Sequence, residues 1–403
     1  MLARSWGPVL VLVFLVGIFA NQPWAVAFSV SVTLVVAAAD YWKKHALREV
    51  VYRRKWRYRR GFPGERLDVQ IEIHNRKLLP ISWLRVIDPG PYAVGTEDES
   101  ILAPSHIELL GELVTLTSLR WFERVVRSYV LLLRKRGVYP VGPALLESGD
   151  FFGLFDSFHE QTTSDLLTVF PELLPLSFLQ LRAEDPFGDL HSPRRLFEDP
   201  NRPMGVRDYH PDDGIRHIHW PATARTGTLQ VKVYQPVSSR VMMVCLNVST
   251  ARQYWLGVDV DLLEHLVKVA ATLAYNGVQD GYAVGLVSNG CLAHSDRPFN
   301  IPPGRSPSQL AMVLAALAGV TPFTTSPFER YLLHSMPKVP YGATLVVITS
   351  VVTQELCEIL LLLRRYRTHT TLLSLEATPP PDLPDIRTIH LPFQGSQRGG
   401  SLA

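Results

Sequence analysis

The stretch VMMVCL at residues 241–246 sets the fold class of the C-terminal half of this 403-residue chain. Six apolar residues in succession, without polar alternation, are typical of a parallel strand that is covered on both faces. A helical pattern follows, and its apolar stripe consists of Leu262, Leu266, Val269 and Leu273. Gly277 is the predicted end of this helix. A buried strand followed by an amphipathic helix indicates an α/β unit.

The segments that follow continue this alternation. Strands are predicted at residues 283–288, 344–349 and 370–375, with a turn at Asn289-Gly290 after the first of them. Ser306-Pro307 and Ser326-Pro327 each resemble a helix start with proline in the first turn. A further helix is predicted at residues 353–367. The sequence therefore predicts an open α/β sheet over residues 240–390, followed by a flexible tail at residues 391–403.

The order and lengths of these elements resemble a von Willebrand factor type A domain. Such domains hold a divalent metal with Asp-x-Ser-x-Ser after the first strand, and this resemblance implies a metal site here at Asn247, Ser249 and Ala251. The chain has an amide in place of the carboxylate, and Thr349-Ser350 brings no Asp after the later strand. Because hard cations prefer carboxylate oxygens, we expect a degenerate site without metal.

Upstream of the sheet lies the stretch GVRDYHPDDGIRHIHWPATARTGTLQVKV at residues 205–233. Charged groups of both signs recur every few residues, with aromatic side chains between them. Arginine suits such a place, because its planar fork can hold two oxygens at once. The residues of the predicted polar network, at a junction between domains, are Gly205, Arg207, Tyr209, Asp212, Asp213, Arg216, His219, Trp220 and Arg225.

This stretch is similar to the signature of the bacterial family called domain of unknown function 58. The matching residues are Gly205, Arg207, Tyr209, Asp213, Arg216, Ile218, Trp220, Ala224 and Arg225. Asp212 departs from the glycine that the signature usually has. Residues 136–143, 149–155 and 168–172 also resemble the family, so the resemblance extends from about residue 61 through the C-terminal domain.

Two interpretations of the Asp/His cluster stay open. Asp212, Asp213, His217 and His219 would suit a metal-dependent or acid/base hydrolase centred on residues 208–219. Alternatively, the cluster is a structural network, because the neighbouring arginines compete for the same carboxylates. The chain has no GxSxG, Walker A, HExxH or paired Cys/His motif. We therefore expect no catalytic residue, no cofactor and no enzymatic activity.

The N-terminus carries two apolar runs, at residues 6–20 and 24–39, with Asn-Gln-Pro between them. Each is near the shortest length that spans a bilayer, and they predict a transmembrane helical hairpin over residues 1–42. A second apolar run disfavours a cleaved signal peptide. The basic block at residues 43–60 predicts, by the positive-inside rule, that both ends face the cytoplasm. It is predicted to face anionic lipid, with nucleic-acid binding as a weaker alternative.

Residues 61–175 have the pattern of an antiparallel β-domain. Residues 66–74 alternate polar and apolar side chains, and strand-like runs follow at residues 82–88, 112–116 and 128–134. These runs predict a small sandwich. Residues 176–239 are predicted to form an extended linker, up to residue 204, and then the signature segment.

The composition adds few constraints on function. The net charge of +3 is small, and an odd count of three cysteines without CxxC spacing argues against a disulfide framework or a zinc site.

The apolar runs, the basic block and the family resemblance together predict a multi-pass protein of the bacterial inner membrane, with its soluble domains in the cytoplasm. We expect a non-enzymatic adaptor without nucleic-acid partners. The family resemblance implies a MoxR-type AAA+ ATPase as the partner, in the assembly or maturation of other proteins. The oligomeric state is left open.

Overall fold

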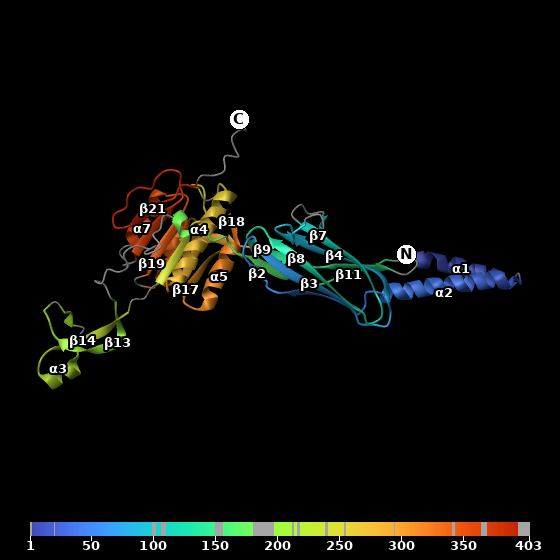
Figure 1. Cartoon of the computed structure of the whole chain (residues 1–403), viewed down its shortest axis with the longest axis horizontal. Coiled ribbons are helices and arrows are strands. Elements are labelled where there is room, and N and C mark those ends of the chain that lie inside the picture. The colour runs from blue at the N-terminus through green and yellow to red at the C-terminus, as the bar shows by residue number, and fades with distance from the viewer. Residues whose placement is uncertain are drawn as a thin grey trace, which may run out of the picture. The chain divides into compact units, whose positions relative to one another are not determined.

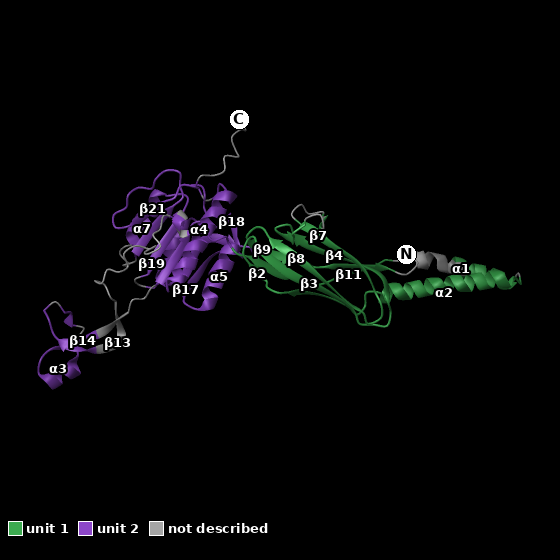
Figure 2. Ribbon diagram, viewed as in Figure 1, with its two compact units in different colours: residues 1–170 green, residues 171–403 purple. Residues whose placement is uncertain are grey.

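The computed structural model describes residues 2–19, 21–98, 102–105, 110–149, 156–179, 197–211, 213–215, 218–237, 241–253, 255–293, 295–340, 343–363 and 369–393. The chain forms two compact units, residues 1–170 and residues 171–403 (Figure 2). Each unit has its own hydrophobic core. The predicted flexible tail at residues 391–403 starts too early, because Leu391 is buried and its backbone N–H donates to the Ser374 carbonyl at 2.8 Å. Residues 394–403 lie outside the described residues.

Two helices begin the chain and lie side by side (Figure 1): α1 (Leu2–Phe19) and α2 (Pro23–His45). Gly17 permits their close approach, because a Cβ there would lie 3.0 Å from Val26 Cγ2. Among the described residues, α2 is the one helix long and apolar enough to cross a membrane. Its 23 residues span about 34 Å, whereas the 18 residues of α1 span about 27 Å of a ~30 Å hydrocarbon core. The structure therefore supports one candidate transmembrane helix, whereas the sequence predicted a hairpin of two transmembrane helices.

Beyond these helices, the described strands of the first unit form three β-sheets. The four-stranded sheet has the order β1 (Val50–Trp56), β3 (Arg66–Asn75), β8 (Arg124–Leu133) and β5 (Val94–Thr96). The five-stranded sheet has the order β11 (Asp156–Glu160), β10 (Leu145–Gly149), β4 (Ile81–Pro91), β7 (Leu110–Leu119) and β6 (Leu102–Pro104). The smallest sheet has the order β2 (Arg60–Gly61), β12 (Asp165–Val169) and β9 (Gly137–Val141).

Alternating burial explains how these sheets share a core. Along β3, apolar side chains point inward at every second position, as predicted from the sequence. Ile71 and Ile73 of β3 are buried in one cluster with Leu84 of β4 and Leu146 of β10. The core therefore lies between the two larger sheets.

The basic block at residues 43–60 is not a separate segment, because β1 takes up its middle. The Arg54 side chain is buried, with Nε and Nη2 donating to the two Asp88 oxygens at 2.8 and 2.7 Å. The Tyr52 hydroxyl donates to the same carboxylate at 2.5 Å. Since one face of β1 is in the core, the β-domain begins at about residue 50 and not at residue 61.

The second unit begins with a hairpin that we call the signature arm, residues 197–237. Its strands are β13 (Phe197–Asp208) and β14 (Gln230–Val237), which pair antiparallel, and α3 (Trp220–Thr226) lies between them in sequence. Gly227, with φ +72°, ends α3 in the left-handed conformation. Part of the predicted extended linker is thus regular structure: η2 (Leu176–Leu179) and the start of β13. Residues 180–196 lie outside the described part.

The remainder of this unit is a mostly parallel α/β sheet, as the sequence predicts. Its main order is β17 (Ser295–Gly304), β16 (Ala283–Leu292), β15 (Val241–Leu246), β19 (Thr344–Thr349), β20 (His369–Ser374) and β21 (Arg387–His390). β17 and β18 (Val320–Thr324) run antiparallel to β16. Every residue of β15 and β19 is buried, which confirms the prediction from VMMVCL.

Among the described residues, the helices that alternate with the strands of this sheet are α4 (Val260–Gln279), α5 (Pro307–Ala318), α6 (Phe328–Ser335) and α7 (Gln354–Leu363), with η4 (Met336–Lys338) after α6. Figure 1 labels α4, α5 and α7. Helices α6 and α7 share a core with β15 and β19. Two local predictions are wrong. Gly277 is not the end of α4 but a buried contact with Met242. Asn289-Gly290 is not a turn but part of β16.

Candidate functional site

The order of the α/β sheet reverses between β15 and β19. From β15 the chain adds β16 on one side and later returns to add β19 on the other. In open α/β sheets, ligands bind outside the carboxyl ends of the strands at such a reversal. Asn247, Asn289 and Thr349 each come one residue after the registered set Leu246, Ser288 and Ile348. Asn247 follows β15, Asn289 lies within β16, and Thr349 is the last residue of β19.

The predicted positions Asn247 and Ser249 are both buried here, at 3 % and 6 % exposure. Asn247 Nδ2 donates to the Thr349 hydroxyl at 3.0 Å, and Asn247 Oδ1 accepts the Ser249 backbone N–H at 3.0 Å. The Ser350 hydroxyl donates to the Ser249 carbonyl at 3.2 Å. Ala251, the third predicted position, is half-buried and brings no ligand atom. The structure thus brings together two loops that are 102 residues apart in sequence.

Asn289 links the loops and was missed by the sequence analysis. Its Nδ2 lies 3.2 Å from both Asn247 Oδ1 and Ser249 Oγ, and its Oδ1 accepts the Val248 N–H at 2.9 Å. Asn289 is fully buried. The signal was a polar residue directly after the predicted strand at residues 283–288, but the Asn-Gly pair indicated a turn, whereas the strand continues to Leu292.

These residues do not fit a divalent cation. Oxygen ligands for such an ion need free lone pairs. Asn247 Oδ1 already accepts two hydrogen bonds, and the Thr349 hydroxyl accepts from Asn247 and Val351 while donating to the Val351 carbonyl. None of the three predicted positions is a carboxylate. Among the described residues, no cluster of three or more His, Cys, Asp or Glu is placed to hold a metal ion.

The segments that adjoin this network in sequence or by strand pairing carry large exposed apolar side chains. Trp255 and Leu256, in the loop that follows β15, are 68 % and 67 % exposed. Phe323, in β18, is 68 % exposed, and the nearby Ser326 carbonyl accepts from Asn289 Nδ2 at 3.4 Å. We call Trp255, Leu256 and Phe323 the apolar rim.

Cys245 lies just beneath the network and is fully buried. Burial raises the pKa of its thiol to about 12. A protonated thiol is a poor nucleophile, so Cys245 acts as an apolar core side chain.

Among the described residues of the signature arm, the predicted network includes an ion pair between Arg207 and Asp213. The Arg207 guanidinium holds both Asp213 oxygens, with Nη1–Oδ2 at 2.7 Å and Nη2–Oδ1 at 2.5 Å. The His210 backbone N–H donates to Asp213 Oδ2 at 2.8 Å. Arg207 and this N–H hold the pKa of Asp213 below its ordinary value. Asp213 is therefore an ionised structural acceptor that closes the loop after β13.

The other predicted residues of the arm have mainly local roles. His219 is the N-cap of α3, with its Nδ1 accepting the Ala222 N–H at 3.0 Å. The Tyr209 N–H donates to the Leu229 carbonyl at 2.9 Å. Trp220 is 63 % exposed. Gly205 pairs with Val233, and Arg225 is exposed in the last turn of α3. Asp212, Arg216 and His217 lie outside the described residues.

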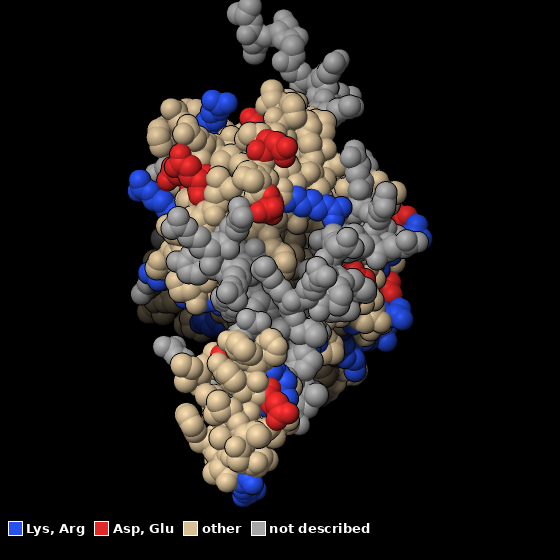
Figure 3. Space-filling model, turned by 90° about the vertical axis from the view of Figure 1, so that its left-hand side faces the viewer, with Lys and Arg blue, Asp and Glu red and all other residues tan. Residues whose placement is uncertain are grey.

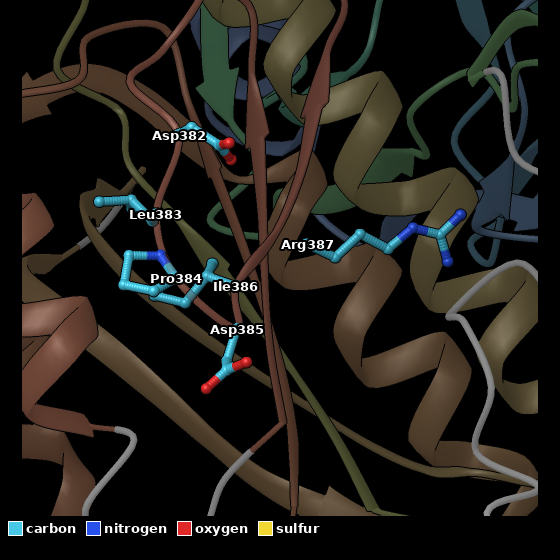
Figure 4. Close-up of a pocket in the computed structure, with 6 residues that line it drawn as sticks. All are labelled: Asp382, Leu383, Pro384, Asp385, Ile386 and Arg387. Atoms are coloured by element: carbon cyan, nitrogen blue, oxygen red, sulfur yellow. The ribbon is translucent and has the colours of Figure 1, made fainter.

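A hollow of about 580 Å³ lies beside the loop that precedes β21. Figure 4 shows its two carboxylates, Asp382 and Asp385, pointing in different directions, with Arg387 directed away from both. Leu383 and Ile386 are buried in the core. The hollow is at the amino end of β21, at the edge of the sheet opposite the Asn289 network. Its carboxylates do not converge on one ligand.

Charge is scattered over the face seen in Figure 3. Among the described residues visible there, acidic and basic side chains are interspersed among uncharged ones. Phosphate backbones are bound by grouped lysines and arginines. This face of the second unit therefore lacks the charge pattern of a nucleic-acid surface among the residues described.

The strand reversal and residues 205–237 of the signature arm lie in a part of the chain that matches a known family. Residues 205–397 match the family described as protein of unknown function DUF58. The DUF58 match begins at Gly205, the first residue of the signature. The three earlier motifs, between residues 136 and 172, lie outside it. An uncharacterized protein of Bacillus subtilis, YeaD, is 22 % identical over 296 residues, covering 73 % of this chain and 68 % of that protein.

Solved structures add little to the DUF58 match. The CARDB domain of a Pyrococcus furiosus protein, in complex with di-metal ions, has a TM-score of 0.21 and 10 % identity, covering 30 % of this chain and 91 % of that one. The sporulation control protein Spo0M of Bacillus subtilis has a TM-score of 0.18 and 14 % identity, covering 33 % and 53 %. At these scores, neither structure carries an argument about this chain.

Proposed function

We propose that this chain is a membrane-anchored, non-enzymatic adaptor that docks another protein at the carboxyl ends of its α/β sheet. The observation that carries the proposal is the Asn289 network. The position where such a sheet binds its ligands is filled by amides and hydroxyls that satisfy one another. No acid, base or nucleophile is left free among them, so the edge is better suited to presenting a surface than to chemistry.

The apolar rim supports docking. Trp255, Leu256 and Phe323 are each about two-thirds exposed, and large aromatic residues are enriched among the side chains that dominate interface energies. A network of buried hydrogen bonds holds the adjoining loops in one conformation. A preorganised surface loses less conformational entropy when it binds.

The domain is, in this proposal, a von Willebrand factor type A-like fold with a degenerate metal position. The amide nitrogen of Asn289 donates to two oxygens, Asn247 Oδ1 and Ser249 Oγ, at 3.2 Å each. A cation would bind the same two oxygens. The amide thus supplies a fixed positive dipole where the related domains hold a metal.

Membrane anchoring is proposed on the length and composition of α2. With α1 as a second span, the pair would form a hairpin with both ends on one side. Basic residues follow α2 directly, which favours a cytoplasmic position for the soluble domains in a bacterial inner membrane. The proposed partner is a MoxR-type AAA+ ATPase, in the assembly or maturation of other proteins.

The alternative function is a hydrolase centred on residues 208–219. Two contacts oppose it. Asp213 is held by both nitrogens of the Arg207 fork, and the Nδ1 of His219 accepts the hydrogen bond that caps α3. A general base needs a free lone pair directed at its substrate. The one lone pair of a neutral His219 is used at Nδ1, and the Arg207 guanidinium on both Asp213 oxygens lowers the pKa of that carboxyl, which makes it a weaker base.

The test is a binding measurement between the full chain in nanodiscs and a purified MoxR-type ATPase. Trp255→Ala and Phe323→Ala should each weaken the complex about tenfold or more, as expected for aromatic hot spots. Tyr58→Ala is the matched control, because Tyr58 is 62 % exposed but lies in the β-domain. Binding that is equally affected by all three variants, or no binding, would reject the docking edge.

A further inference from the structure

Two hairpin tips of the β-domain meet the end of α2. The first tip, residues 76–80, joins β3 to β4, and the second, residues 120–123, joins β7 to β8. The Lys77 ammonium donates to the Ala46 and Arg48 carbonyls at 2.5 and 2.6 Å, just past the last residue of α2. The Phe122 N–H donates to the Lys77 carbonyl at 3.2 Å. Both tips are therefore fixed beside the point where α2 ends.

A buried amide holds the tips together. Asn75 is fully buried, and its Nδ2 lies 2.9 Å from the Leu79 carbonyl and 2.9 Å from the Arg120 carbonyl. Its backbone N–H donates to the Glu123 carbonyl at 2.9 Å. One side chain thus connects the two turns, so they form one surface.

This surface carries three large apolar side chains that the fold does not cover. Leu78 is 74 % exposed, Trp121 is 65 % exposed and Phe122 is 57 % exposed. Phe122 also has φ +53°, a left-handed conformation that is uncommon for an aromatic residue. Tips of tight turns are normally polar, whereas here adjacent tips place apolar groups outward. We call Leu78, Trp121 and Phe122 the tip surface.

Basic residues lie in the two tips and at the end of α2 that adjoins them. The exposed ones are Lys44, Arg48, Arg76 and Arg120. Of the nearby acidic groups, Asp40 pairs with Lys44 at 2.6 Å and Glu123 accepts the Arg120 backbone N–H at 2.6 Å. Glu49 is exposed. Basic side chains therefore outnumber acidic ones in these segments.

We propose that the tip surface is a second membrane contact, which inserts into the interfacial layer of an anionic phospholipid bilayer. Tryptophan is enriched at the level where a bilayer meets water, and lysine and arginine are attracted to anionic headgroups there. The tips lie beside the end of α2, which is where a spanning helix leaves the hydrocarbon. This inference rests on the proposed membrane anchoring by α2. Together the helix and the tips would fix the tilt of the β-domain on the membrane.

The test uses an environment-sensitive fluorophore on single cysteines in the full chain. Cys357→Ser removes the one partly exposed native thiol, since Cys245 and Cys291 are buried. The label is placed by Leu78→Cys in the tip surface, by Leu34→Cys in α2 or by Tyr58→Cys. Leu34 and Tyr58 are 66 % and 62 % exposed. Tyr58 follows the far end of β1 and is the matched control. The proteins are reconstituted in phosphatidylglycerol nanodiscs whose acyl chains carry a quencher.

The expected result is loss of emission at positions 34 and 78 and full emission at position 58. Loss at position 34 with full emission at position 78 would overturn the tip contact while leaving the α2 anchor standing. Full emission at position 34 would overturn both. A label at position 78 that is shielded from water but not quenched by lipid would mean that a protein covers the tips. Equal loss at position 78 in zwitterionic nanodiscs would remove the role assigned to the basic residues.

Discussion

Replacing Asn289 by alanine perturbs the candidate site at its centre. The substitution removes the acceptor of the Val248 N–H and the donor to Asn247 Oδ1 and Ser249 Oγ. Val248 is fully buried, so its N–H would have no partner. An orphaned buried donor costs about 1–3 kcal/mol, and each lost hydrogen bond adds about 0.5–1.5 kcal/mol. We therefore expect the free energy of unfolding to fall by about 3 kcal/mol.

For a unit of this size, about 3 kcal/mol corresponds to a fall in melting temperature of about 6–12 °C. The assay is thermal unfolding of the full chain in detergent, read together with hydrogen exchange of residues 241–250 to assign the transition to the α/β sheet. Exchange of the Val248 amide should become faster in Asn289→Ala.

Asn276→Ala is the matched control. Asn276 lies in the same unit, and its amide makes one hydrogen bond to the Thr272 carbonyl on the half-exposed side of α4. Its loss should change the free energy of unfolding by less than about 1 kcal/mol. Equal melting temperatures for the two variants, or unchanged exchange at Val248, would refute the view that Asn289 holds the site.

Two further predictions concern charged pairs. Arg54→Ala leaves Asp88 buried without a cation and should lower the stability of the β-domain by about 3–5 kcal/mol, whereas Arg53→Ala, at an exposed position of β1, should change it by less than about 0.5 kcal/mol. Chemical denaturation measures both, and similar values would contradict the prediction. Because Arg207 lowers the pKa of Asp213, the pairing should stabilise the signature arm above the ordinary carboxyl pKa of 3.8 and be lost as the pH falls through the lowered value. Hydrogen exchange of residues 205–215 follows this loss, and loosening already at about pH 5 would contradict it.

Local periodicity predicted the strands well. β3 alternates because one face is in the core, and β15 is continuously apolar because both faces are covered. Such a pattern depends only on the residues of one short segment, so it can be recognised from that segment of the sequence alone. The order of elements then predicted an open α/β sheet.

The local predictions were wrong where contacts between residues distant in sequence determine the structure. Gly277 is small because Met242 packs against it, and Gly290 is small because Val248 does. Both glycines resemble a helix end or a turn when only their neighbours are considered. Their conformation is decided instead by close packing against a residue more than 30 positions away in the sequence.

The candidate site was predicted in part. The loops after β15 and β19 were expected at one edge, and Asn247 and Thr349 meet there at 3.0 Å. Asn289 was not foreseen, because its role depends on the register between β15 and β16. In the signature segment, Arg207 and Asp213 both belong to the predicted network and form an ion pair. The Arg207 side chain is half-exposed, and the pair closes a turn.

The central claim is that a protein partner docks at the carboxyl edge of the sheet, and site-specific photocrosslinking in cells tests it most directly. A photoreactive residue replaces Trp255 or Phe323 in the apolar rim, or Tyr275, which is 36 % exposed on α4. The account predicts a crosslink to a MoxR-type AAA+ ATPase from positions 255 and 323 and none from position 275. No ATPase crosslink from the rim, or an equal yield from position 275, would contradict it.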